Sequence, residues 1–201
     1  ETENDDNFSK KLGYLGDIYI NDAFSCSHRK QASVHKITKY INKSYAGPLF
    51  KKEIDAINLV IKNKKEPVTC IIGGSKISTK INVIISLIEK INNLIIVGAM
   101  ANNFLEYKNL KVGKSLVENN TKEIIEKIYK KAIENNCEIM IPGDCMVGTS
   151  FKGKGKNKDL DKIQDNEIIL DIGPNTINSI KKKIEQSKTV LWNGPAGYFE
   201  N

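Results

Sequence analysis

The segment VTCIIGGSKISTK, residues 68–80, decides the fold class of this chain. An apolar run, Val68–Ile72, ends in Gly73 and Gly74, and apolar residues at helical spacing follow from Ile77. This order predicts a buried strand, a tight turn and a helix, which is the repeating unit of a parallel α/β sheet. Glycine in such a turn lets the backbone come close to a ligand.

Two lysines in the same segment point to an anionic ligand. A helix directly after the glycines would aim unpaired N–H groups and the positive end of its dipole at one point. Lys76 and Lys80 are four residues apart, so both ammonium groups would rise from one helical face. We therefore predict a phosphate site here. The alternative is an ordinary glycine turn with two solvated lysines, because both features are common in α/β proteins.

The alternation of strands and helices continues along the chain. We expect strands over 17–21, 68–72, 94–97, 138–141 and 189–192, and helices over 8–15, 48–63, 77–91, 100–107, 121–135 and 176–186. Such alternation is typical of a mostly parallel sheet covered by helices. The polar stretch 152–158 fits neither pattern.

Three further glycine turns follow apolar runs. They are VGAMANNFL from Val97, DIGPNT from Asp171 and WNGPAGYFE from Trp192. We expect all of them at the carboxyl edge of the same sheet, beside Gly73 and Gly74. One glycine turn is common, whereas several at one sheet edge indicate a ligand site.

Composition narrows the possible functions. The chain has 201 residues, of which 40% are hydrophobic and 27% charged, enough for one large domain or one domain with part of another. Its formal charge of +7 would suit nucleic acid or phosphorylated small molecules, but no aromatic residues interleave with a basic cluster. No apolar run is long enough to span a bilayer. Four dispersed cysteines indicate reduced thiols and a cytoplasmic protein.

Familiar nucleotide motifs are absent. Gly113, Lys114 and Ser115 imitate the end of a Walker A loop, but Lys108 stands where its first glycine is needed. No G-x-G-x-x-G follows a predicted strand, so an ordinary dinucleotide fingerprint is not expected either.

Seven motifs resemble phosphoglycerate kinase in their order and approximate spacing. They are GDIYINDAFSCSHRKQAS (16–33), AGPLFKKEI (46–54), GGSKISTKI (73–81), GAMANNFL (98–105), GKSLVE (113–118), DIGPNT (171–176) and WNGPAGYFE (192–200). The resemblance covers nearly the whole chain, while the family is about twice this length and has two Rossmann-like domains.

The resemblance implies that this chain is a central fragment. Residues 1–46 would end an amino-terminal substrate-binding domain, 47–63 would be an interdomain hinge helix, and 64–201 a truncated nucleotide-binding domain. The expected fold is α/β: an incomplete Rossmann-like parallel sheet with helices on both faces, preceded by the tail of a second α/β domain.

The resemblance also implies roles for individual residues. Lys76 would be the catalytic cation that neutralises the phosphoryl group in flight, and Arg29 would bind the phosphate of phosphoglycerate. Glu200 would accept hydrogen bonds from ribose hydroxyls. The residues implied to bind nucleotide are Gly73, Gly74, Lys76, Lys80, Gly98, Asn193, Gly194, Pro195 and Glu200. Mg²⁺ would arrive with ADP or ATP, and its protein ligand is expected outside this chain, so no metal ligand is expected within it.

The implied activity is phosphoryl transfer between 1,3-bisphosphoglycerate and ADP, giving 3-phosphoglycerate and ATP in glycolysis. A cytoplasmic monomer that binds neither nucleic acid nor membrane is expected. The family's Asp-x-Asn substrate motif and GGDT loop are missing, so we expect the isolated chain to be inactive. The alternatives are a non-catalytic nucleotide-binding module and a basic nucleic-acid-binding protein.

Three residues depart from the family's usual pattern. Ala99 stands where many members have a further glycine, Ile169 stands where glycine is usual, and Tyr198 replaces a small aliphatic residue. We therefore expect an adenine pocket that is tighter than usual.

Overall fold

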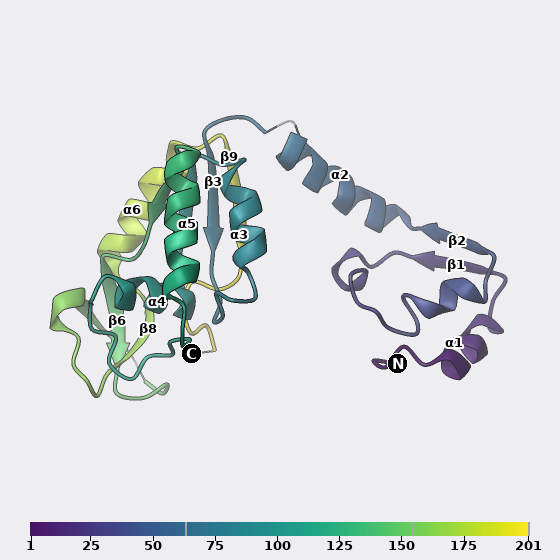
Figure 1. The fold of residues 1–201 in the computed structure, drawn as a ribbon, viewed down its shortest axis with the longest axis horizontal. Coiled ribbons are helices and arrows are strands. Elements are labelled where there is room, and N and C mark those ends of the chain that lie inside the picture. Colours follow the sequence, from purple (N-terminus) through teal and green to yellow (C-terminus); the bar gives the residue numbers. More distant parts are fainter. Residues whose placement is uncertain (63, 154, 201) are drawn as a thin grey trace. The chain divides into compact units, whose positions relative to one another are not determined.

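The structure, a computed structural model, describes residues 1–62, 64–153 and 155–200 (Figure 1). Its contacts divide the chain into two compact units, Glu1–Asn63 and Lys64–Asn201. Within the described residues, none of the helices combines the length and apolarity that crossing a membrane would need.

The first unit contains a small parallel sheet and helices. Its elements are α1 (Asp6–Gly13), β1 (Ile18–Asn21), η1 (Phe24–Cys26), η2 (Lys36–Lys39), β2 (Lys43–Ala46) and α2 (Pro48–Lys62). β1 and β2 are parallel, with Ile18 opposite Lys43 and Asn21 opposite Ala46. The sequence pattern does not predict β2. The helix expected over 48–63 is present as α2, and Asn63 lies outside the described residues.

The second unit is built around a parallel sheet, as expected. Its elements are β3 (Val68–Ile72), α3 (Ile81–Ile88), β4 (Asn93–Ile96), α4 (Ala99–Tyr107), α5 (Lys122–Glu134), β5 (Glu138–Met140), α6 (Pro174–Glu185) and β9 (Thr189–Asn193). The strand order is β5-β4-β3-β9, and every neighbouring pair is parallel.

Helices cover both faces of this sheet. Cys70 and Ile72 of β3 pack in one apolar cluster with residues of α3, α4 and α5, and α3 and α5 lie side by side there (Figure 1). Ile71 points the other way and packs with Ile180 of α6. All five residues of β3 are buried. A strand that is covered on both faces needs a continuous apolar run instead of an alternating one, which explains the sequence of β3.

A second, antiparallel sheet is not predicted by the sequence pattern. β6 (Asp144–Gly148) pairs with β7 (Lys156–Asp159) on one side and β8 (Ile168–Ile172) on the other. β7 begins in the polar stretch 152–158 and ends at Asp159, and residue 154 of that stretch is outside the described part. Because β8 pairs with β6, the DIGPNT turn does not end a strand of the parallel sheet. The turn still lies near that sheet's carboxyl edge, since a Cβ on Gly197, in the loop after β9, would lie 2.4 Å from Asp171.

The helix that follows this turn is capped by a residue distant in sequence. The carboxylate of Asp144, on β6, accepts hydrogen bonds from the amides of Asn175 (3.0 Å) and Thr176 (2.7 Å) at the start of α6. The Thr176 hydroxyl donates to the same carboxylate at 2.6 Å. A Cβ on Gly173 would lie 2.3 Å from this carboxylate, so the residue before the helix has to be glycine. The cap therefore joins the antiparallel sheet to the helix that leads into β9.

Helix α2 begins in the same way. The carboxylate of Asp22 accepts hydrogen bonds from the amides of Leu49 (2.6 Å) and Phe50 (2.9 Å). A Cβ on Gly47 would lie 2.3 Å from an oxygen of Asp22. In both units a Gly-Pro pair thus starts a helix whose cap comes from a strand or loop earlier in the chain.

We predict that Asp144→Asn lowers the free energy of unfolding by about 2 kcal/mol at neutral pH, because an amide cannot accept all three bonds. Burial of the carboxyl raises its pKa, but the hydrogen bonds from Thr176 and Asn175 outweigh burial and leave the pKa below its usual value. Because the folded pKa is the lower one, this stabilisation is present above the unfolded value of about 3.9 and is lost as the pH falls through the folded value.

Urea unfolding at neutral pH and again below the unfolded pKa of Asp144 measures both effects. The difference between the two proteins should shrink at the lower pH. Asp161→Asn, at an exposed position, is the control and should change little. Equal unfolding free energies for the original protein and Asp144→Asn at neutral pH would contradict the role of the cap.

Candidate functional site

Three glycine turns meet at the carboxyl ends of β3, β4 and β9. A Cβ on Gly73 would lie 2.0 Å from the carbonyl oxygen of Pro195, and a Cβ on Gly98 would lie 2.8 Å from the same oxygen. Gly98 and Gly194 also have positive φ values of 68° and 84°, which side chains disfavour. We call Gly73, Gly74, Gly98, Gly194 and Pro195 the glycine cradle.

Backbone hydrogen bonds join the three turns. They run from the amide of Gly73 to the carbonyl of Asn193 (2.8 Å), from Gly98 to Ala196 (2.9 Å) and from Met100 to Gly74 (2.7 Å). These three amides are therefore occupied by neighbouring turns. Their bonds hold the cradle together.

The cradle lies where the order of the sheet changes direction. The chain runs from β3 through β4 to β5 on one side and returns to β9 on the other side of β3. Ligands of open α/β sheets bind beyond the carboxyl ends of the strands at such a switch point. Gly73 directly follows β3 and Gly194 directly follows β9, so the cradle occupies this position.

Lys80 reaches the cradle. Its ammonium group donates to the carbonyl oxygen of Gly73 (3.0 Å) and to Oδ1 of Asn193 (2.9 Å). Because ammonium is a compact charge with three donors, this position beside a glycine turn suits a polyphosphate. The structure thus brings Lys80 and Asn193, both of which the resemblance implies to bind nucleotide, together with the glycines.

Lys76 is placed differently from the sequence prediction. Helix α3 begins only at Ile81, so Lys76 lies in the non-helical segment before it and Lys80 is the residue just before the first turn. The hydroxyl of Thr79 donates to the carbonyl of Lys76 at 3.0 Å, which closes a local turn. The prediction that both lysines share one helical face is therefore wrong. The Lys76 side chain is exposed.

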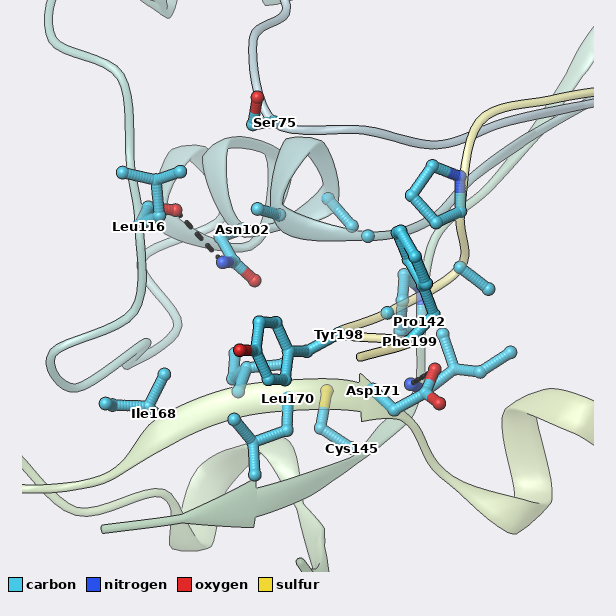
Figure 2. A pocket seen from close by; sticks show the side chains of 18 of the residues that line it. Ser75, Asn102, Leu116, Pro142, Cys145, Ile168, Leu170, Asp171, Tyr198 and Phe199 are labelled. Atoms are coloured by element: carbon cyan, nitrogen blue, oxygen red, sulfur yellow. Dashed lines mark hydrogen bonds between the residues drawn. The ribbon is translucent and has the colours of Figure 1, made fainter. Parts of the chain in front are cut away.

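A cavity of about 440 Å³ adjoins the cradle. It is lined by α4, β8 and the loop after β9, and Figure 2 shows Asn102, Leu170 and Tyr198 from these three segments around it. Most of the lining side chains are apolar, among them Leu105 and Leu116. Of the residues predicted to bind nucleotide, four line the cavity: Gly74, Gly98, Pro195 and Glu200.

An aromatic pair at this cavity comes from two distant loops. The rings of Phe151 and Tyr198 have centroids 5.1 Å apart and planes inclined by 51°. The amide of Tyr198 donates to the carbonyl of Leu170 at 2.6 Å, which attaches the loop after β9 to β8. The sequence draws attention to Tyr198 as a departure from the family. It does not single out Phe151, because the hairpin that carries Phe151 has no recognisable pattern.

The cavity also contains a cysteine. Cys145 is buried, and burial raises the pKa of its thiol to about 12. The thiol is therefore protonated at neutral pH and is no nucleophile. Cys26, Cys70 and Cys137 are free as well, as predicted.

Arg29 belongs to the other unit. It lies in the loop after η1, is exposed, and donates its amide to the carbonyl of Cys26 at 2.9 Å. In the described part of the chain, no group of three or more His, Cys, Asp or Glu side chains is arranged to hold a metal ion.

Known proteins resemble this chain over its whole length. The phosphoglycerate kinase of Wolbachia pipientis wMel is 45% identical over 202 residues, which are 100% of this chain and 50% of that protein. The phosphoglycerate kinase of Xanthobacter flavus is 41% identical and is matched over 51% of its length. The chain thus spans about half the length of the curated relatives that it matches.

Solved structures agree in fold. The phosphoglycerate kinase of Coxiella burnetii matches with a TM-score of 0.81 at 38% identity, covering 100% of this chain and 52% of the other. The phosphoglycerate kinase of Pyrococcus horikoshii OT3 has a TM-score of 0.76 at 24% identity, covers 98% of this chain and 52% of the other, and supports the fold alone.

A family model described as phosphoglycerate kinase matches residues 1–201. With this match, the relatives and the shared α/β fold, the chain belongs to the phosphoglycerate kinase family.

Proposed function

We propose that the protein carrying this chain transfers a phosphoryl group between 1,3-bisphosphoglycerate and ADP, giving 3-phosphoglycerate and ATP in glycolysis. The observation that supports this most is the Lys80 ammonium group on the glycine cradle beside an apolar cavity. A cation over a glycine turn suits phosphates, and an adjoining apolar cavity suits a base.

The nucleotide is proposed to lie across both features. Its base would enter the cavity beside Tyr198, and its ribose hydroxyls would donate to Glu200, which lines the same cavity. The phosphates would lie over the cradle, where Lys80 and Asn193 meet. The same side chain that now bonds to Gly73 and Asn193 would then turn part of its donor capacity to the phosphates.

Lys76 is proposed to act on the group in transfer. Phosphoryl transfer depends mainly on positioning and on cations that meet the charge of the transferring group. Lys76 precedes Lys80 by four residues, and its exposed side chain can reach a bound substrate. Arg29 is proposed to bind the phosphate of phosphoglycerate, and α2 to act as the hinge helix between the two domains.

Mg²⁺ is proposed to enter bound to the nucleotide. Within the described residues, no group of three or more His, Cys, Asp or Glu side chains is arranged to hold the ion, so the nucleotide phosphates would carry it. Mg²⁺ usually keeps several waters and binds to substrate phosphates, which fits this arrangement. We further propose a cytoplasmic location, since the described cysteines are free thiols, and a monomeric state.

We predict that substitutions of the two lysines have different kinetic effects when they are made in a protein as long as the relatives. Lys76→Ala should lower kcat by about 100-fold, because it removes a cation that acts mainly in the transition state, and should change the KM for ADP little. Lys80→Ala should raise the KM for ADP about tenfold, which corresponds to about 1.4 kcal/mol. Steady-state assays in both directions measure these values, with exposed Lys90→Ala as the control. An unchanged kcat in Lys76→Ala would refute its catalytic role.

Nucleotide binding should change the fluorescence of the single tryptophan. Trp192 is 59% exposed, and its indole donates to the carbonyl of Gly194 in the cradle at 2.8 Å. Titration with ADP should therefore change the fluorescence to a saturating value. Tyr198→Ala should raise the dissociation constant for ADP at least about fivefold, because base stacking contributes about 1–3 kcal/mol. Inorganic triphosphate, which lacks a base, should bind both proteins equally.

Exposed Tyr14→Ala is the matched control for this titration. Duplex DNA at physiological salt should give no signal. A signal with DNA that falls steeply as salt rises, together with none for ADP, would favour a nucleic-acid-binding protein over the proposed kinase.

A further inference from the structure

The GKSLVE segment, residues 113–118, has no assigned role, since it is not a P-loop. In the structure it connects separate elements of the second unit. The hydroxyl of Ser115 accepts a hydrogen bond from the amide of Ile169 on β8 at 2.8 Å. The side chain of Asn102 on α4 donates to the carbonyl of Leu116 at 3.0 Å (Figure 2).

The last residue of this segment bonds to the turn that carries the two lysines. The carboxylate of Glu118 accepts hydrogen bonds from the amide of Ser78 at 3.1 Å and from the Ser78 hydroxyl. Ser78 lies midway between Lys76 and Lys80. Glu118 therefore contacts the centre of the lysine turn, residues 75–80, from a loop 40 residues further along the chain.

Glu118 is itself held in place from α4. Its amide donates to Oδ1 of Asn103 at 2.8 Å. Asn103 is only 1% exposed, and its side-chain nitrogen donates to the carbonyl of Met100 at 3.2 Å. Because α4 starts directly after Gly98, the position of Glu118 is tied to the glycine cradle.

Other contacts hold the lysine turn on either side of Ser78. It is not helical, so the hydrogen bonds of α3 do not fix the position of Lys76. Ile77 is fully buried and anchors the backbone on one side of Ser78. On the other side, the carbonyl of Lys80 accepts a hydrogen bond from the amide of Ile84 in α3 at 2.9 Å. The ammonium group of Lys80, which a nucleotide would engage, bonds to Gly73.

The charge of Glu118 favours the same arrangement. The hydrogen bonds from the Ser78 side chain and amide, with a smaller contribution from the charge of Lys76, hold the pKa of the Glu118 carboxyl below its usual value. The group is therefore ionised at neutral pH and accepts both bonds as a carboxylate, which strengthens them.

From these contacts we propose that Glu118 is a positioning residue: by binding Ser78 it holds the lysine turn in a fixed place over the glycine cradle. Glu118 touches neither nucleotide nor the transferring group. It acts through Ser78 on the orientation of Lys76 and Lys80. This proposal rests on the proposed phosphoryl-transfer role of those lysines.

The test uses the protein at the length of its relatives, with Glu118→Ala, Glu118→Gln, Ser78→Ala and the double variant Glu118→Ala with Ser78→Ala. Glu89→Gln is the matched control, because Glu89 is ion-paired with Lys131 (2.6 Å) at the other end of α3. Two quantities are measured: kcat and KM for ADP, and amide hydrogen exchange of a peptide covering residues 75–80.

Glu118→Ala should lower kcat about tenfold or more, with a smaller change in KM, and should speed exchange of the lysine turn about tenfold without a comparable change in α5. Ser78→Ala keeps the hydrogen bond from the backbone amide of residue 78 to Glu118, so its loss of kcat should be smaller than that of Glu118→Ala. The double variant should lose no more than Glu118→Ala, since both substitutions remove one contact. Glu118→Gln keeps an acceptor oxygen and should recover part of both losses. Glu89→Gln should change neither quantity.

The outcomes separate this proposal from the proposed function. Exchange of residues 75–80 that is equally slow in Glu118→Ala and the original protein would overturn the positioning role, whether or not the protein is a kinase. Fully additive losses in kcat for the two single variants would also overturn it. An original protein that transfers no phosphoryl group would sink the proposed function alone, and the exchange data would still decide the role of Glu118.

Discussion

The close approach of Gly73 and Gly98 to the carbonyl of Pro195 is the constraint on which the site depends. A side chain at Gly73 would lie 2.0 Å from that oxygen, so no other residue allows β9 to end there. The approach brings the end of β9 beside the ends of β3 and β4, and it places Asn193 where Lys80 can bond to it. The position of the site is thus set by the packing of the backbone turns, and Lys80 is positioned by its bonds to these turns.

Long-range polar contacts then hold the surrounding elements in register. Asp144 joins the antiparallel sheet to α6, which leads into β9, and Glu118 joins the lysine turn to α4. Both carboxylates accept several hydrogen bonds, and both have a lowered pKa for that reason. Asp144 is costly to replace, because its buried donors on Thr176 would be left unsatisfied. Parts of the chain far apart in sequence are therefore connected at the points where the proposed chemistry needs fixed positions.

Much of this could be predicted from the sequence, because the relevant signals are local. The apolar run of β3 and the glycines after it indicate a parallel strand and a close approach, and both are present. The antiparallel sheet was not predictable in the same way, since β7 is a polar edge strand whose pairing with β6 depends on tertiary contacts. The expected helix over 77–91 begins too early for a similar reason, since α3 starts only at Ile81. The apolar spacing around Ser78 favours a helix, but the bonds of Ser78 to Glu118, 40 residues away, hold it in a turn.

The most direct measurement is a crystal structure of the protein, at the length of its relatives, with ADP bound. The account predicts phosphate oxygens within hydrogen-bond distance of the Lys80 ammonium group above the glycine cradle, and the base in the cavity beside Tyr198. A nucleotide bound elsewhere, with Lys80 still bonded only to Gly73 and Asn193, would contradict it.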